Sequence, residues 1–336
     1  MPKRLFNLRD QVPLLDIVSY GRRAPGTRSA FSSAERDYIG RTVRGTPEVM
    51  IKVSGGGQSV GAVAAHFRYI DRKGELDIET DEGDRISGKG SERELLDDWG
   101  LGLEEQQANS TYSGMPGRKP TKLVHNIVFS MPAGTPPKKL LAAVRHFAQE
   151  KFALQHRYAM VLHTDHDHPH VHLVLKAVSE DGVRLNIRKA TLREWRRDFA
   201  AALRIQGVAA NATERAVRGS TRSQKPDGIY RAMRRGESTH YEQRALAAAH
   251  EVRSGRLNPG PGKERLLSTR GDVERGWRAV GNLLERDGHA ELALEVRRFV
   301  DRMPPPKTER EWIAGELLDH VRNRLRERPR IADRAR

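Results

Sequence analysis

Five of the chain's 13 histidines lie within ten residues, from His163 to His172. The segments on either side, YAMVL and LVLKAV, are apolar and partly β-branched, as strands are. The Asp-His-Pro between them is typical of a turn. The pattern therefore predicts two antiparallel strands, at 157–165 and 170–178, and the surrounding domain has to be built on this hairpin.

The alternation of side chains along a strand sorts these histidines. His170 and His172 fall on one face of their strand, and Val171 falls on the other. Residues paired across antiparallel strands lie about 4.5–5.5 Å apart, which brings His163 next to His170. Three imidazoles on one rigid face predict a metal site with open coordination positions, as catalytic metals have. We expect Asp165 to accept a ring N–H from a ligand histidine and fix its tautomer.

The alternative to a metal site is a polar loop whose histidines are solvated, and a single His-x-His pair would favour it. Three histidines on the same face, with an aspartate nearby, favour the metal instead. We expect His166 and His168 to contribute no ligand, because they lie in the turn.

Basic residues exceed acidic ones by 60 to 44, and the formal charge is +16. The excess is concentrated in 184–236, which holds 14 Lys or Arg and 4 Asp or Glu. This local excess of positive charge favours binding to a polyanionic partner, nucleic acid first and an anionic membrane surface second. The alternative is that the segment is only a solvated surface. Within a helix predicted at 191–206, we expect Arg193, Arg196 and Arg197 to contact phosphates.

Several classes of protein are excluded by composition. The chain has no cysteine, so it has no disulfides, no cysteine nucleophile and no thiolate zinc site. It has no apolar run near the ~20 residues of a membrane span, and its N-terminus, MPKRLFNLRDQ, lacks the apolar core of a signal peptide. We therefore expect a soluble, cytoplasmic protein without a membrane span.

Hydrophobic periodicity outside the hairpin predicts an α+β fold, with an antiparallel sheet, flanking helices and an all-helical C-terminal region. The predicted strands are 48–53, 75–78 and 122–131. The predicted helices are 60–70 with Ser59 as its cap, 91–107, one begun by Pro136 and Pro137 with Thr135 as its cap, 191–206, 242–253, 272–287, 290–303 and 309–327. These elements suggest a mostly disordered basic leader (1–46), a mixed domain (47–218), a basic linker with a short helix (219–262) and a helical region with an Arg-rich tail (263–336).

Tyr69 is out of place on its predicted helix. The apolar stripe of that helix is Val60, Val63, Phe67 and Ile70, and Tyr69 lies off it, flanked by basic side chains. An aromatic residue usually belongs to the core, which is the alternative here. Forming the phenolate at pH 7 costs about 4 kcal/mol from a pKa near 10, and nearby cations and a metal can supply part of it. Tyr69 is therefore a candidate nucleophile, with Tyr112 as the next choice.

Three motifs resemble those of relaxases, the conjugative mobilization nucleases of the HUH superfamily. His163-x-Asp165-x-x-His168-Pro169-His170-x-His172 resembles their metal motif. The stretches AHFRYIDRKGEL (65–76) and HNIVFSMPAGT (125–135) resemble the nucleophile helix and the second motif of the T-DNA border endonuclease type. The motifs stand in the family's order within about 48–218. The resemblance implies a relaxase nuclease domain there, with a ferredoxin-like palm.

The same resemblance implies a role for each matched residue. Tyr69 is the nucleophile, the three paired histidines bind the metal, Asp165 orients a ligand and Ser130 contacts DNA. Many members have Asn four residues after the last histidine, where this chain has Lys176. We expect this cation to contact the phosphate.

The implied activity is metal-dependent nicking of one DNA strand at a specific site, which forms a 5′-phosphotyrosine and initiates transfer of a plasmid or integrative element. The family works with Mg²⁺ or Mn²⁺, and imidazole ligands also suit Zn²⁺. The implied partners are single-stranded DNA at an origin of transfer, relaxosome accessory proteins and a type IV coupling protein. The implied location is the bacterial cytoplasm, with export through a type IV secretion channel.

Three alternatives stay open. A rolling-circle replication initiator or single-strand transposase would use the same site, a metal phosphoesterase would lack the covalent step, and a DNA-binding accessory protein would lack catalysis.

The tail 321–336 has 7 Arg against 2 acidic residues. It is either a solvated helix end or an export signal.

Overall fold

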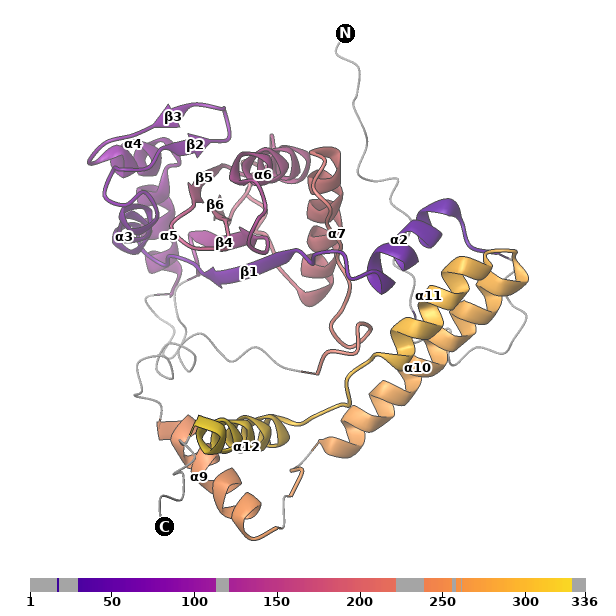
Figure 1. The fold of residues 1–336 in the computed structure, drawn as a ribbon. Coiled ribbons are helices and arrows are strands. Elements are labelled where there is room, and N and C mark those ends of the chain that lie inside the picture. Colours follow the sequence, from indigo (N-terminus) through magenta and orange to yellow (C-terminus); the bar gives the residue numbers. More distant parts are fainter. Residues whose placement is uncertain are drawn as a thin grey trace, which may run out of the picture. The chain divides into compact units, whose positions relative to one another are not determined.

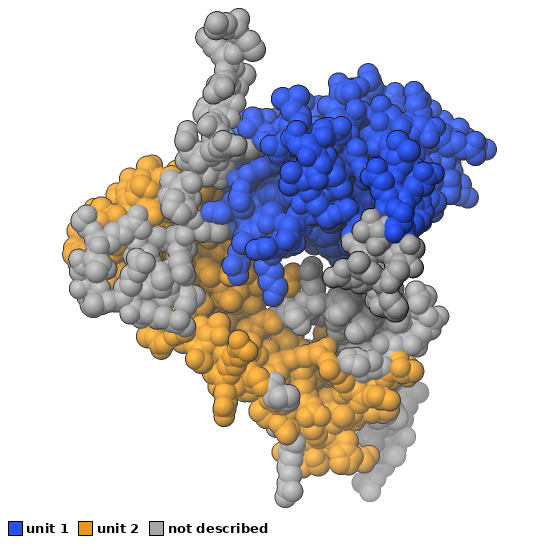
Figure 2. Space-filling model, turned by 180° about the vertical axis from the view of Figure 1, so that it is seen from behind, with its two compact units in different colours: residues 1–12, 45–212 blue, residues 13–44, 213–336 orange. Residues whose placement is uncertain are grey.

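The computed structural model describes residues 17, 30–112, 121–221, 239–255, 258–260 and 262–327 (Figure 1). They form two compact units (Figure 2). The described part of unit 1 is 45–112 and 121–212. Unit 2 combines the described residues of 13–44 with those after 212.

Unit 1 is built on a six-stranded sheet of order β1-β4-β6-β5-β2-β3, and all of its strand pairs are antiparallel. Its strands are β1 (Met50–Gly55), β2 (Ile78–Thr80), β3 (Arg85–Ile86), β4 (Val124–Ser130), β5 (Tyr158–His163) and β6 (His170–Lys176). The hairpin β5–β6 has the predicted register, with His163 opposite His170. The prediction of an antiparallel sheet with flanking helices is confirmed.

Helices cover both faces of this sheet (Figure 1). On one face, α6 (Pro137–Phe152) and α7 (Lys189–Ile205) pack over a core that includes Phe129, Phe199 and Leu173. On the other, α3 (Val60–Ile70), α4 (Ser91–Asp98) and α5 (Leu101–Tyr112) pack over Val174 and its neighbours. Strand β6 is buried on both sides because Leu173 faces the first core and Val174 faces the second.

Local signals decide where several helices begin and end. Ser59 caps α3, because its hydroxyl oxygen accepts a hydrogen bond from the Ala62 N–H (3.2 Å). The predicted cap at Thr135 is wrong: its hydroxyl donates to the Pro132 carbonyl (2.9 Å), and α6 begins after Pro136. The single helix predicted over 91–107 is two helices, because Gly100 takes a left-handed φ of 63° between them.

Unit 2 is helical. It contains α2 (Ser33–Val43), α9 (Thr239–Arg253), α10 (Lys263–Arg286), α11 (Ala290–Asp301) and α12 (Glu309–Glu327). The core beneath α2, α10 and α11 includes Ile39, Trp277 and Val296. The all-helical C-terminal region is thereby confirmed. Within the described residues, no helix combines the length and apolar character needed to cross a bilayer.

The prediction of a mostly disordered leader is wrong for residues 33–43. Ser32 and Glu35 form a reciprocal capping box at the start of α2, and Ile39 is fully buried. The sequence contains this Ser-x-x-Glu signal, but the surrounding Arg, Gly and Ser residues are typical of disorder. Most of the leader before residue 30, the linker residues 222–238 and the tail residues 328–336 lie outside the described residues.

Candidate metal and nucleophile site

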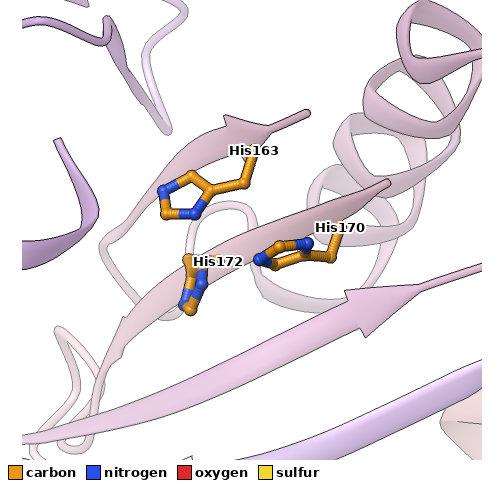
Figure 3. A group of neighbouring side chains, drawn as sticks. All are labelled: His163, His170 and His172. Atoms are coloured by element: carbon orange, nitrogen blue, oxygen red, sulfur yellow. The ribbon is translucent and has the colours of Figure 1, made fainter. Parts of the chain in front are cut away.

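The three predicted ligands meet at one end of the β5–β6 hairpin (Figure 3). The ring centroid of His163 lies 5.0 Å from that of His170 and 4.6 Å from that of His172. One ring nitrogen from each histidine can be chosen so that all three lie within 4.8 Å of one another. The cluster continues the sheet face that α3 covers, just beyond the end of that helix.

Backbone carbonyls fix the orientation of two of these rings, and the acceptor nitrogen of His163, Nδ1, lies 3.4 Å from Arg72 Nη2. His163 Nε2 lies 2.6 Å from the Ile70 carbonyl oxygen, which can only accept, so Nε2 carries the hydrogen and Nδ1 carries the lone pair. In the same way, His170 Nδ1 lies 3.1 Å from the His168 carbonyl oxygen, which leaves Nε2 as its acceptor. Neutral rings fixed in this way are what a divalent metal needs from histidine.

Burial keeps the rings of His163 and His172 neutral. Burial, and then the positive charges that His163 and His170 would carry, lower the pKa of His172 to about 3. Burial also lowers the pKa of His163 from its ordinary value, although the hydrogen bond to Ile70 acts to raise it. Both rings are therefore uncharged near pH 7, the form that binds a metal ion.

Asp165 does not hold the ring N–H of His163 in this structure. Its Oδ1 lies 4.0 Å from His163 Nδ1, and its Oδ2 accepts a hydrogen bond from Arg72. The expected tautomer-fixing role is taken by the backbone of Ile70, which no side-chain spacing could have indicated. Burial alone would raise the pKa of Asp165, but the hydrogen bond and charge of Arg72 lower it.

Tyr69 lies beside the histidines, on the last turn of α3. Its side chain is off the core face as predicted, and the residue is 57% exposed. Its ring centroid lies 6.5 Å from that of His172, and the ring of His66 lies within 6.3 Å of both. The guanidinium carbon of Arg72 lies 5.4 Å from the Tyr69 ring centroid. In the sequence, Arg72 is one of the basic residues that flank Tyr69 and His66 shares its stripe, but no separate role is predicted for either.

Ser130 is also part of this face, and Lys176 is in a different environment. Ser130 pairs with His170 across β4 and β6, is buried, and donates to the Pro169 carbonyl (3.3 Å). Lys176 is buried at the far end of β6, where its ammonium lies 3.3 Å from Glu104. The phosphate contact expected of Lys176 is therefore corrected to an internal ion pair.

The arginines of α7 are not brought together with the histidines. Trp195 and Phe199 pack this helix on the opposite face of the sheet. From there Arg196 donates to the backbone of Ile51 in edge strand β1 (3.3 Å). Arg193 and Arg197 lie on the same helix, so all three belong to a surface other than the histidine site. The basic residues of 222–236 lie outside the described residues.

Comparison with known proteins supports what this geometry indicates. Residues 88–205 match the family model of the MobA/VirD2-like relaxase nuclease domain. We assign this span to the relaxase nuclease domain family. Of the site residues, Tyr69 precedes the matched span. Its role therefore depends on the geometry and on the motif around it.

Curated relatives of this relaxase domain include T-DNA border endonucleases named VirD2. The one from Agrobacterium fabrum is 26% identical over 219 residues, and the one from Rhizobium rhizogenes is 25% identical over 200. The matches cover 57% and 51% of this chain but only 45% and 42% of those proteins. A solved structure from work on vancomycin resistance transfer in Staphylococcus aureus overlaps half of the chain, at 12% identity and a TM-score of 0.32, which is too low to carry an argument.

Proposed function

We propose that this protein is a relaxase that nicks one strand of DNA at a specific site, with Tyr69 as the nucleophile, and so initiates transfer of a plasmid or integrative element. The observation that carries the proposal is the placement of an exposed tyrosine ring 6.5 Å from the ring of His172, which belongs to a cluster of three histidines. Such a nucleophile beside a metal site suits phosphodiester chemistry.

His163, His170 and His172 would hold a divalent ion, with Mg²⁺ or Mn²⁺ expected from the family and Zn²⁺ also suited to imidazole. The residues fit such an ion because the ring N–H groups of His163 and His170 face the carbonyls of Ile70 and His168, which leaves the other nitrogen of each ring as an acceptor. At His163 the ion would replace Arg72 Nη2, which lies 3.4 Å from Nδ1. A bound ion would supply Lewis-acid polarisation of the phosphodiester and neutralise part of its charge.

The chain's own residues account for the rest of the chemistry. The Tyr69 oxygen forms a bond to the scissile phosphorus as the bond from phosphorus to the 3′ oxygen breaks. The phenol gives up its proton and the leaving 3′ oxygen takes one up. One phosphodiester replaces another, so the step is reversible and the strand can be rejoined. Ser130, next to His170 on the same face, would position the DNA strand.

The partners and location follow from the same proposal. Single-stranded DNA at an origin of transfer is the substrate, and accessory proteins and a type IV coupling protein would bring the complex to a secretion channel. The protein would act in the bacterial cytoplasm before export. These assignments come from the relaxase domain and from the chain's charge of +16.

The covalent step can be tested without knowing the nick site. A pool of random single-stranded DNA, labelled at its 3′ end, is incubated with protein and Mn²⁺ and run on a denaturing gel. Tyr69 attack leaves the 3′-labelled segment on the protein, whereas a 5′ label leaves with the released strand. Tyr69→Phe should abolish the labelled protein band. Tyr38→Phe, in unit 2, should retain it. A labelled band in Tyr69→Phe would contradict the assignment.

A further inference from the structure

The turn after α3 has an unusual backbone. Arg72 and Lys73 take left-handed φ angles of 56° and 60°, a region that side chains other than those of Gly, Asn and Asp rarely adopt. Gly74 continues the turn with φ 90° and packs against Gly88 so closely that a Cβ there would lie 2.4 Å from its backbone. This packing holds the strained turn in place, and such strain is often found at functional sites.

The strained turn directs the Arg72 side chain into the histidine site. Its Nη1 donates to the Tyr69 carbonyl (3.3 Å), and its Nη2 donates to Asp165 and lies 3.4 Å from His163 Nδ1. Its guanidinium carbon lies 5.4 Å from the Tyr69 ring centroid. One cation therefore contacts the proposed nucleophile, a proposed metal ligand and the nearby carboxylate.

We propose that Arg72 is a further catalytic residue, whose guanidinium binds a non-bridging oxygen of the scissile phosphate and stabilises the charge that develops during attack by Tyr69. This inference rests on the proposed nicking function. A guanidinium has five N–H donors in a planar fork that matches phosphate oxygens. The Arg72 side chain is 31% exposed, so a bound strand can reach it.

Asp165 acts in this scheme as a positioning residue for Arg72. The ion pair is half-exposed, at 31% and 45% for the two side chains, and such pairs stabilise a fold only slightly. Its effect is instead to hold the guanidinium between Tyr69 and His163 before the strand binds. Preorganised charge of this kind favours the transition state because it needs no rearrangement during the reaction.

The test uses the 3′-labelled random single-stranded pool with Mn²⁺ and measures the rate of covalent adduct formation. Arg72→Asn removes the guanidinium, and Asn tolerates the left-handed backbone, so the turn is kept. Lys73→Asn is the matched control, because this neighbouring side chain is exposed and has nearly the same φ. Mn²⁺ affinity by calorimetry and the melting temperature are measured for each variant.

Arg72→Asn should slow adduct formation by about 10²–10³-fold, as loss of one charge-stabilising donor does in other enzymes. Its Mn²⁺ affinity and melting temperature should stay close to those of the wild type, and added guanidinium chloride should restore part of the rate. Lys73→Asn should react at nearly the wild-type rate.

Wild-type adduct rates in Arg72→Asn would overturn the inference, and so would a loss of rate that parallels a loss of Mn²⁺ binding or folding and is not rescued by guanidinium. If the wild-type protein itself forms no adduct, the proposed nicking function fails instead.

Discussion

Acid should destabilise the protein through His125, a histidine that lies away from the metal site. His125 pairs with Leu175 between β4 and β6, on the sheet face covered by α6 and α7. Burial, and then the positive charge of Lys122, lower its pKa to about 4. In the unfolded chain the pKa of histidine is about 6.5. Between these values the unfolded chain binds a proton that the folded protein excludes, so the free energy of unfolding falls as pH falls.

The size of the effect follows from the two pKa values. His125 should lower the free energy of unfolding by about 1.4 kcal/mol for each pH unit below 6.5, and by about 3 kcal/mol when pH 4 is reached. Above pH 6.5 its contribution is constant. His172, with a pKa lowered to about 3, adds a similar slope of its own. Replacing His125 should therefore remove its own contribution to the pH dependence of the free energy of unfolding, and the contribution of His172 should remain.

Urea unfolding of the metal-free protein at about pH 7, 6 and 5 measures this directly. His125→Gln should lose about 2 kcal/mol of the wild-type change in the free energy of unfolding between pH 7 and pH 5. His168→Gln, which replaces an exposed histidine of the β5–β6 connection, is the control and should keep the full dependence. An identical pH dependence in His125→Gln and the wild type would refute the argument from burial.

Three further predictions concern the site and the tail. His170→Ala should abolish both Mn²⁺ binding, measured by calorimetry, and nicking, measured on gels. His166→Ala, in the exposed β5–β6 connection, should retain both. Equal losses in the two variants would contradict the assignment of ligands from the alternation of side chains along β6. Lys176→Met should lower the free energy of unfolding by about 1–3 kcal/mol in urea, because it leaves Glu104 without its buried partner, yet leave binding of single-stranded DNA unchanged; weaker DNA binding without loss of stability would restore the phosphate role. Deleting 321–336 should leave nicking intact and reduce transfer between cells; transfer at the wild-type frequency would refute an export signal.

The sequence allowed the histidine cluster to be predicted because two short-range rules determine it. Alternation along β6 places His170 and His172 on one face, and the tight β5–β6 connection sets His163 opposite His170. The position of Tyr69 outside the apolar stripe of its helix could be predicted for a similar reason. These features depend on residues close together in the chain, so they need no knowledge of the remaining fold.

Other features of the site depend on contacts between distant segments. The partner of Asp165 is Arg72, 93 residues away, and the ring of His163 bonds to the backbone of Ile70, also 93 residues away. Alternation along β6 places Lys176 on the same face as His170 and His172, but α5 brings Glu104 next to its ammonium group. No periodicity in the sequence indicates how the chain leaves α3 or where α5 packs.

The proposed nicking reaction joins Tyr69 covalently to DNA. The adduct formed with single-stranded DNA and Mn²⁺ can be trimmed with nuclease, digested with trypsin and analysed by mass spectrometry. Cleavage after Arg68 and Arg72 releases the peptide Tyr-Ile-Asp-Arg. We expect this peptide to carry a nucleotide through its tyrosine. A nucleotide on the peptide that contains Tyr112, or on no tyrosine at all, would contradict it.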